Sequence, residues 1–446
     1  MRAGSLARSV AALTDLSGRF VPSAFVIAAL LTSAVFAAAF LAAGAAPGDI
    51  LDYWGAGFWA LLGFGMQMCL IVVTGAMLAE APPVERALDA FARLPKSGPQ
   101  AAALAAAASM LLCWLHWGLG IMASAFLARR IALRRPATDF RLLVAVSYFG
   151  MGALWHAGLS GSAPLLVATP GHFLEPLIGV IPLSHTVFSP FNLGLAAVTL
   201  AALTLLAWAM YPAEEDAFRL SPDALNALSE IREPERTGEM NAWMRLMEHS
   251  RAVSGALGLC GVLYLLRAFS RSPELTLDRL NFIFLTAGLL LYPSPASFVR
   301  AAERASRYVH GIILQFPFYA GMYGVIKGAG LDMMLGRAFV RLAAADTFPL
   351  IVYWYSGVLN YFIPSGGSKW AIEAPYLLEA AKTLGVSPAK VVLAYSWGDM
   401  VTDMIQPFWC VPLLAVAKLE FKDILGYEAA AFLVCAALGS VAFLCI

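Results

Sequence analysis

This chain is dominated by apolar runs long enough to cross a lipid bilayer, and no other feature restricts its fold as strongly. A membrane span needs roughly 20 apolar residues. Such runs occur near 22–44, 55–79, 101–128, 185–210, 252–269, 279–292, 308–328, 388–417 and 425–446. Only 13% of the residues are charged, against about 25% in soluble domains. We therefore predict an all-α polytopic membrane protein with about nine spans.

The composition also excludes several classes of function. Lys and Arg number 30 and Asp and Glu number 29, so the net charge of +1 creates no field that would attract nucleic acid. The 6 cysteines lie in apolar segments without the spacing of metal ligands. We expect free thiols, no metal centre and no cofactor, apart from a coupled H⁺ or Na⁺.

The start of the chain is typical of a multi-pass membrane protein without a cleavable signal. Its first apolar run is too long for the hydrophobic part of a cleavable signal and has the length of a span. Arg2, Arg8 and Arg19 precede this run, and basic residues favour the cytoplasmic side. We therefore expect a cytoplasmic N-terminus.

Two interrupted stretches are near-copies of each other. Residues 160–170 read SGSAPLLVATP and residues 365–375 read SGGSKWAIEAP, so the Ser-Gly pair and the closing Pro share one spacing. Non-helical backbone is tolerated inside a membrane only where protein buries it or where it lines a cavity. We interpret each stretch as a re-entrant hairpin, near 141–173 and near 346–383, with a simple kinked span as the alternative.

Other features recur in the same order and predict two structural repeats. Amphipathic segments at 84–97 and 295–308 precede the two hairpins and are typical of helices at a membrane interface. We divide the chain into a first membrane repeat at 1–210, a polar connector at 211–251 and a second membrane repeat at 252–446, which ends in an extra span. Such duplication is typical of secondary transporters with a substrate site between the repeats.

Arginines around the third apolar run favour inverted repeats. Basic residues should face the cytoplasm, yet three plain crossings from a cytoplasmic N-terminus would place them outside. These residues are Arg129, Arg130, Arg134, Arg135 and Arg141. A break within residues 114–120 that turns the run back would return these arginines to the cytoplasmic side. Each half would then cross the membrane an odd number of times, and the two repeats would be inverted.

The Ser-Gly stretches supply the candidate substrate-binding residues. A helix N-terminus after each stretch would direct its N–H groups at a carboxylate, glycine would allow close approach and serine would add hydroxyl donors. The candidates are Ser160, Gly161, Ser162, Ser365, Gly366, Gly367, Ser368 and Lys369. Close helix packing through small residues is the alternative.

Charged and amide side chains in apolar segments are the candidates for binding the coupling ion. An ionisable group at the bilayer centre costs about 2.5–3.5 kcal/mol, so Lys369 should pair with a carboxylate or with an anionic substrate. Asp399 and Asp403 are four residues apart and share a helical face. The coupling-ion candidates are Asp399, Asp403, Glu373, Asn192 and Asn360. A purely structural ion pair is the alternative.

Two further observations leave alternatives open. His156 precedes the first stretch and could sense protons or could simply bond to a neighbour. Residues 158–161 fit the GxSG pattern of rhomboid-type intramembrane proteases, in which a Ser–His pair would act as nucleophile and base. Because the Ser-Gly stretch is duplicated, a two-part binding site is the better interpretation, and we expect no enzymatic step.

Five segments also resemble a known family. Residues 54–79, 158–171, 314–322, 362–375 and 405–417 are similar to the bacterial short-chain fatty-acid transporters of the acetoacetate and butyrate uptake type. That family belongs to the broader ion-transporter superfamily. The resemblance implies a scaffold, a mobile transport domain that carries both hairpins, elevator-type motion and a homodimer. This chain departs from the family pattern at Lys369, where histidine is frequent, and at Asp399 and Asp403, where Glu and Asn occur.

Together these features predict a secondary transporter that imports short-chain monocarboxylates with H⁺ or Na⁺. A dicarboxylate or an aminobenzoyl-glutamate type of anion is the alternative substrate. An intramembrane serine hydrolase is the alternative from another class.

Overall fold

The described part of the chain is helical. The computed structural model describes residues 24–213, 217–229, 241–362, 364–406 and 408–446, and these ranges contain no strand. Arg2, Arg8 and Arg19 therefore lie outside the described residues. Five helical stretches in these ranges are long and apolar enough to cross a membrane: Leu62–Ala79, Gly98–Leu115, Pro190–Ala209, Ala242–Arg271 and Phe421–Leu444. The fold class predicted from composition is thus confirmed as all-helical, and the count of nine spans stays a prediction.

The first half of the chain begins with longer helices and then breaks into short ones. In order they are α2 (Ala24–Leu41), α3 (Pro47–Gly57), α4 (Leu62–Ala79), α5 (Pro82–Phe91), α6 (Gly98–Leu115), α7 (Trp117–Arg134), α8 (Phe140–Val146), α9 (Phe149–Ala153), α10 (Ser162–Val167), α11 (Glu175–Ile178), the 3₁₀ turn η1 (Leu183–His185) and α12 (Pro190–Ala209).

The remaining helices follow a connector that is itself partly helical. They are α13 (Pro222–Ser229), α14 (Ala242–His249), α15 (Arg251–Arg271), α16 (Leu277–Leu291), α17 (Pro295–Ser306), α18 (His310–Gly328), α19 (Leu331–Leu342), α20 (Phe348–Phe362), α21 (Gly366–Leu384), α22 (Pro388–Val401), the 3₁₀ turn η2 (Thr402–Ile405), α23 (Val411–Ala417) and α24 (Phe421–Leu444).

Helices α6 and α7 form an antiparallel hairpin whose tip is His116. The ring of His116 caps α7, because its Nδ1 accepts a hydrogen bond from the Leu119 N–H at 3.2 Å. At the open end, Arg135 donates hydrogen bonds to the carbonyl oxygens of Pro95 and Lys96, which lie just before α6. The third apolar run therefore turns back within residues 114–120, as the arginine positions favoured.

The segment 141–173 differs from the two-armed hairpin predicted for it. It consists of the short helices α8, α9 and α10, and residues 154–161 between α9 and α10 form no α-helix. This stretch packs against the tip of the α6–α7 hairpin: the N–H of Leu159 donates to the Trp114 carbonyl oxygen at 2.8 Å. A side chain at Gly158 would overlap that same oxygen. The hairpin tip thus satisfies backbone groups that no helix satisfies here.

The second Ser-Gly stretch opens a long helix. Helix α20 ends before it and α21 begins at Gly366. The two helices meet side by side, since the hydroxyls of Tyr355 and Tyr376 lie 3.0 Å apart. Helix α19 packs on α21 as α5 packs on α7, and α18 packs on α21 as α4 packs on α7.

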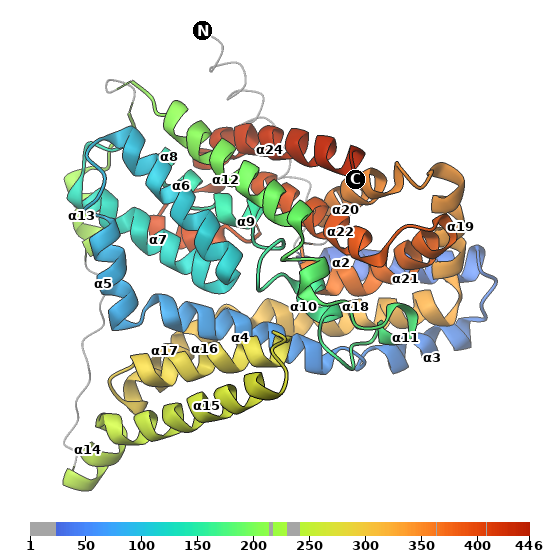
Figure 1. Cartoon of the computed structure of the whole chain (residues 1–446), viewed down its shortest axis with the longest axis horizontal. Helices are drawn as coiled ribbons and strands as arrows, with labels where there is room; N and C mark the ends of the chain where they lie inside the picture. Colours follow the sequence, from blue (N-terminus) through green and yellow to red (C-terminus); the bar gives the residue numbers. More distant parts are fainter. Residues whose placement is uncertain (1–23, 214–216, 230–240, 363, 407) are drawn as a thin grey trace.

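Figure 1 shows how these helices are layered. Helices α15, α16 and α17, in yellow, lie together beside α4, while α24, in red, runs along the opposite side of the molecule. The amphipathic segments predicted at 84–97 and 295–308 correspond to α5 and α17. In this view α9, α10 and α22 lie between these outer layers.

The contact at Gly158 gives a test of this packing. We expect Gly158→Ala to destabilise the protein by about 1–3 kcal/mol, because overpacking a close backbone contact costs that much. Gly194→Ala on α12 is the matched control, since no atom lies within 4 Å of the added methyl. Thermal unfolding in detergent measures both variants. Equal melting temperatures for the two would contradict the contact.

Candidate functional site

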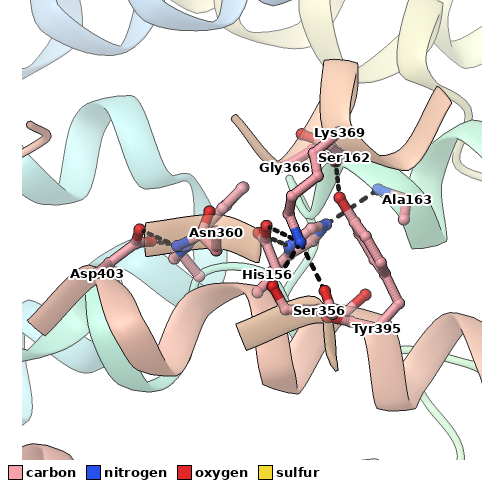
Figure 2. A network of polar contacts seen from close by, with 12 residues as sticks. His156, Ser162, Ala163, Ser356, Asn360, Gly366, Lys369, Tyr395 and Asp403 are labelled. Carbon is pink, nitrogen blue, oxygen red and sulfur yellow. Dashed lines mark hydrogen bonds and ion pairs between the residues drawn. The ribbon is translucent and has the colours of Figure 1, made fainter. Parts of the chain in front are cut away.

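The two Ser-Gly stretches meet in the structure although 205 positions separate Ser160 from Ser365. A Cβ atom on Gly366 would lie 2.7 Å from His156 Cε1 and 2.8 Å from Asp399 Oδ2. Only glycine leaves room for this approach between the start of α21 and the non-helical stretch of the first half. Figure 2 shows the polar network at this junction.

Lys369 lies at the centre of that network and is fully buried. Its Nζ forms ion pairs with Asp399 Oδ1 at 3.0 Å and Glu373 Oε1 at 3.2 Å. It also donates to the Oγ of Ser356 at 2.6 Å and lies 4.3 Å from the centre of the Tyr395 ring. Because a buried charge without a partner is strongly destabilising, these contacts are what allow an ammonium group to be buried here.

His156 connects the first half of the chain to this cluster. The N–H of Ala163 donates to its Nε2 at 3.1 Å, and its Nδ1 lies 2.6 Å from Asp399 Oδ2. The first contact requires Nε2 to be unprotonated, so the proton is assigned to Nδ1, which donates to Asp399. The arrangement therefore holds a neutral imidazole and fixes its tautomer.

Asp403 lies one turn beyond Asp399 and has different partners. Its Oδ1 accepts hydrogen bonds from Asn360 at 2.8 Å and from Gln406 at 2.9 Å. Its Oδ2 accepts from Trp155 Nε1 at 3.1 Å. Three neutral donors can stabilise a carboxylate without cancelling its charge. The coupling-ion candidates Asp403 and Asn360 are thus hydrogen-bonded to each other.

The side chain of Asn192, a further coupling-ion candidate, is engaged in three hydrogen bonds. Its Nδ2 donates to the carbonyl oxygens of Ala157 and Val187, each at 2.9 Å. Its Oδ1 accepts from Trp397 Nε1 at 2.8 Å. The amide thus ties α12 to the non-helical stretch and to α22, and its oxygen is already engaged.

The first Ser-Gly stretch mainly supports the fold. Ser160 Oγ accepts a hydrogen bond from the Trp117 N–H at 2.9 Å and so caps the start of α7. A side chain at Gly161 would overlap the carbonyl oxygen of His156. Ser162 is buried, and its hydroxyl contacts Met68 Sδ at 3.6 Å. Because both ring nitrogens of His156 are engaged by Ala163 and Asp399, they are not available as a base for Ser160, which argues against a serine hydrolase.

The second Ser-Gly stretch has more groups that could bind a substrate than the first. Helix α21 begins at Gly366 without a side-chain cap, so its first N–H groups point at the junction. The hydroxyls of Ser365 and Ser368 lie 2.6 Å apart at this end. A side chain on Gly367 would lie 2.8 Å from the ring of Phe64, so an apolar surface adjoins the polar helix start.

Ser356, Tyr395 and Trp155 belong to the network but were missed by the sequence analysis. Tyr395 donates through its hydroxyl to the Gly366 carbonyl oxygen at 2.7 Å. A signal was available: polar residues four apart share a helical face. Such pairs occur on each of three helices, as Ser356 with Asn360, Lys369 with Glu373, and Tyr395 with Asp399.

Comparisons with known proteins identify one family. The sequence matches the family described as short chain fatty acid transporter over residues 5–446. A protein of Escherichia coli (strain K12), provisionally named a short-chain fatty acid transporter, is 36% identical over 416 residues, which cover 93% of this chain and 94% of the relative. A protein of Haemophilus influenzae with the same provisional name is 34% identical over 426 residues, with coverage of 93% and 94%.

Two solved structures share the fold. The Alcanivorax borkumensis YdaH transporter superposes with a TM-score of 0.55 at 16% identity and covers 89% of this chain and 86% of its own. Neisseria gonorrhoeae MtrF, described within a class of antimetabolite efflux pumps, gives a TM-score of 0.51 at 13% identity, with coverage of 98% and 96%. At such identities the likeness concerns the fold alone.

The ion pairs of Lys369 can be tested through stability. We expect Lys369→Met to cost about 3–5 kcal/mol near neutral pH, because removing one partner leaves buried carboxylates uncompensated. The cost should shrink as the pH falls, since protonation of Asp399 and Glu373 removes their charges. Unfolding titrations at several pH values measure this dependence.

Lys327→Met is the matched control for this prediction. Lys327 Nζ lies 3.0 Å from Asp332 Oδ2, and its side chain is 40% exposed. Such a pair contributes at most about 1 kcal/mol. A loss for Lys369→Met no larger than that of this control, or one that grows on acidification, would contradict the buried ion pairs.

Proposed function

This chain belongs to the short-chain fatty acid transporter family, and on that premise we propose that it imports short-chain monocarboxylates across the bacterial inner membrane. Butyrate and acetoacetate are the expected type of substrate, and H⁺ or Na⁺ is the coupling ion. The family match confirms the resemblance seen in the sequence motifs and makes the protein a transporter rather than an enzyme. It also agrees with a multi-pass membrane protein in bacteria.

One observation carries the choice of substrate: an uncapped helix start lies beside a buried ammonium group. The first N–H groups of α21, the hydroxyls of Ser365 and Ser368, and Lys369 all lie at one junction. Helix N-termini favour anions through their unpaired N–H groups and the helix dipole. A single carboxylate is the anion that this small set of donors fits best.

The surroundings of the helix start favour a short apolar tail. Phe64 and Phe316 lie against Gly367. An apolar cavity of about 70 Å³ between α4 and α18 has Phe316 in its lining. A tail of a few methylene groups is compatible with a space of this size. A second carboxylate on the substrate would find only apolar side chains there.

The charges at the junction support coupling to a cation. Lys369 is the single ammonium group of the network, whereas Asp399, Glu373 and Asp403 supply three carboxyl groups, all at most 1% exposed. With His156 neutral and the acids ionised, the network carries two net negative charges. An incoming carboxylate would add a third, and buried charge of one sign is costly. Bound H⁺ or Na⁺ would remove this cost.

The packing also supports an arrangement with moving parts. In this proposal the α6–α7 and α20–α21 hairpins, with the broken helices beside them, form a mobile transport domain. Helices α15, α16 and α17 with α4 form the scaffold. The two hairpins are then the equivalent elements of inverted repeats, and elevator-type motion and a homodimer complete the proposal. This pairing replaces the pairing of Ser160 with Ser365 that the sequence suggested.

Transport by purified protein in proteoliposomes tests the function. We expect labelled butyrate to exchange against internal acids of two to six carbons, and an imposed pH or Na⁺ gradient to drive its accumulation. Exchange of a dicarboxylate or of aminobenzoyl-glutamate in place of butyrate would overturn the substrate class. Butyrate accumulation that ignores both gradients would overturn the coupling.

The hydroxyl groups at the start of α21 give a sharper test. We expect Ser365→Ala to raise the KM for butyrate about tenfold or more, because a hydrogen bond to a charged group contributes about 1.5–3 kcal/mol and each 1.4 kcal/mol is a factor of ten. Ser270→Ala is the control, since the Ser270 hydroxyl binds only its own helix, at Arg267, at the exposed end of α15. A KM equal to that of the control would remove Ser365 from the substrate site.

A further inference from the structure

A second buried acid, Glu428, lies outside the network around Lys369. It belongs to α24, and its side chain is 0% exposed. Neither of its carboxylate oxygens has a hydrogen-bond partner among the described residues, and it forms no ion pair there. All other acids of the site have a cationic or hydrogen-bonding partner, so the isolation of Glu428 calls for an explanation.

The face of α24 that carries Glu428 is directed at the broken helices of both halves. Helix α24 packs against α8 and α9 of the first half and against η2 of the second. The hydroxyl of Tyr148, between α8 and α9, is likewise buried and unpartnered among the described residues. Glu428, Asp403 and Cys410 all lie close enough to act on this hydroxyl electrostatically. The two unpartnered groups therefore share one buried region.

No cation within the described part of the chain compensates Glu428. The titratable groups close enough to feel its charge are Tyr148, Cys410 and Cys435, and Asp403 acts on the same Tyr148 hydroxyl. Arg141 belongs to α8, which packs on α24, and it is engaged with Asp423 at 3.0 Å. An ionised carboxylate in apolar surroundings without a partner is strongly disfavoured, so Glu428 carries a proton in this arrangement.

A bound proton explains the site better than a bound metal ion. Metal ions require several oxygen ligands around one centre, and the described residues contain no group of three His, Cys, Asp or Glu side chains that could hold one. A neutral acid needs only its own proton. A side chain that is always neutral, such as glutamine, could fill this buried position equally well. An ionisable side chain inside a membrane protein therefore indicates a function.

Glu428 also lies within reach of the polar end of its helix. The Arg141–Asp423 ion pair marks that end, where Arg141 is 41% exposed. Glu428 is five residues further along α24, about 8 Å at 1.5 Å per residue. A modest shift of the broken helices next to Tyr148 would let water reach Glu428 from this end of the helix. The proton could then leave or enter.

We propose that Glu428 is the site at which the coupled proton binds, so that transport is H⁺-linked. This inference rests on the proposed function, because it assigns the ion that accompanies the carboxylate. The proton moves from water on one side to a carboxylate oxygen of Glu428, which becomes a neutral acid, and it is released to water on the other side. No other bond changes.

The test replaces Glu428 by glutamine, which mimics the neutral acid but cannot release a proton. Proteoliposomes containing a pH indicator are supplied with butyrate without Na⁺. We expect the wild-type protein to acidify the lumen as butyrate enters and to accumulate butyrate under an imposed pH gradient. E428Q should lose both responses, and Glu428→Asp should retain part of them. E428Q that keeps both responses in full would overturn the proposal.

Two controls distinguish a specific loss of proton coupling in E428Q from misfolding of the variant. Thr199→Val on α12 removes another buried and unpartnered polar group, and we expect it to behave as wild type. The infrared spectrum of the wild-type protein should contain the carbonyl band of a neutral acid, and this band should be missing from E428Q. Identical spectra in this region would show that Glu428 is ionised and would refute the proposal. This measurement does not depend on transport by E428Q. Wild-type protein that transports no monocarboxylate would instead refute the proposed function.

Discussion

A buried ammonium group that must be neutralised without water is the constraint on which the rest of the structure depends. Lys369 meets this constraint through Asp399 and Glu373, and Asp399 in turn bonds to His156 of the first half. The charge of one side chain thus fixes the positions of α21, α22 and the non-helical stretch relative to one another. Any motion of one half against the other must carry these groups together or exchange their partners, because an uncompensated charge in a bilayer is costly.

The unpaired backbone of the broken helices imposes a second constraint of the same kind. In hydrocarbon every N–H and C=O needs a partner. Here the Trp114 carbonyl oxygen at the tip of the α6–α7 hairpin accepts from the Leu159 N–H, and the Trp117 N–H of α7 donates to the Ser160 hydroxyl. The α20–α21 hairpin leaves its helix start uncapped beside Lys369. One hairpin therefore supports the fold, whereas the other has the free donors that an anion needs. This asymmetry gives the proposed substrate site one well-defined end.

The acids around Lys369 and the separate acid Glu428 have different roles in the two proposals. In the proposed function, a carboxylate binds beside the acids around Lys369, and the excess negative charge of these acids would favour a cation that enters with the substrate. Glu428 lies on α24, which packs against the broken helices, and it is five residues from the polar end of that helix. Tyr148 is close enough to both Glu428 and Asp403 for their charges to act on its hydroxyl. A proton on Glu428 could thus offset the charge of the substrate without competing with it for Lys369.

The sequence by itself determined the helical membrane fold, the amphipathic helices, the family and the need of Lys369 for a carboxylate or an anion as partner, because hydrophobicity and the cost of buried charge act locally and leave a readable pattern. It did not determine which elements pair. Ser160 and Ser365 look equivalent in sequence, yet one caps α7 and the other lies at an open helix start. Asn192 likewise proved to be a structural tie. Only the tertiary structure decided these roles, since contacts such as His156 with Asp399 join residues 243 positions apart and depend on the shape of the whole packed interior.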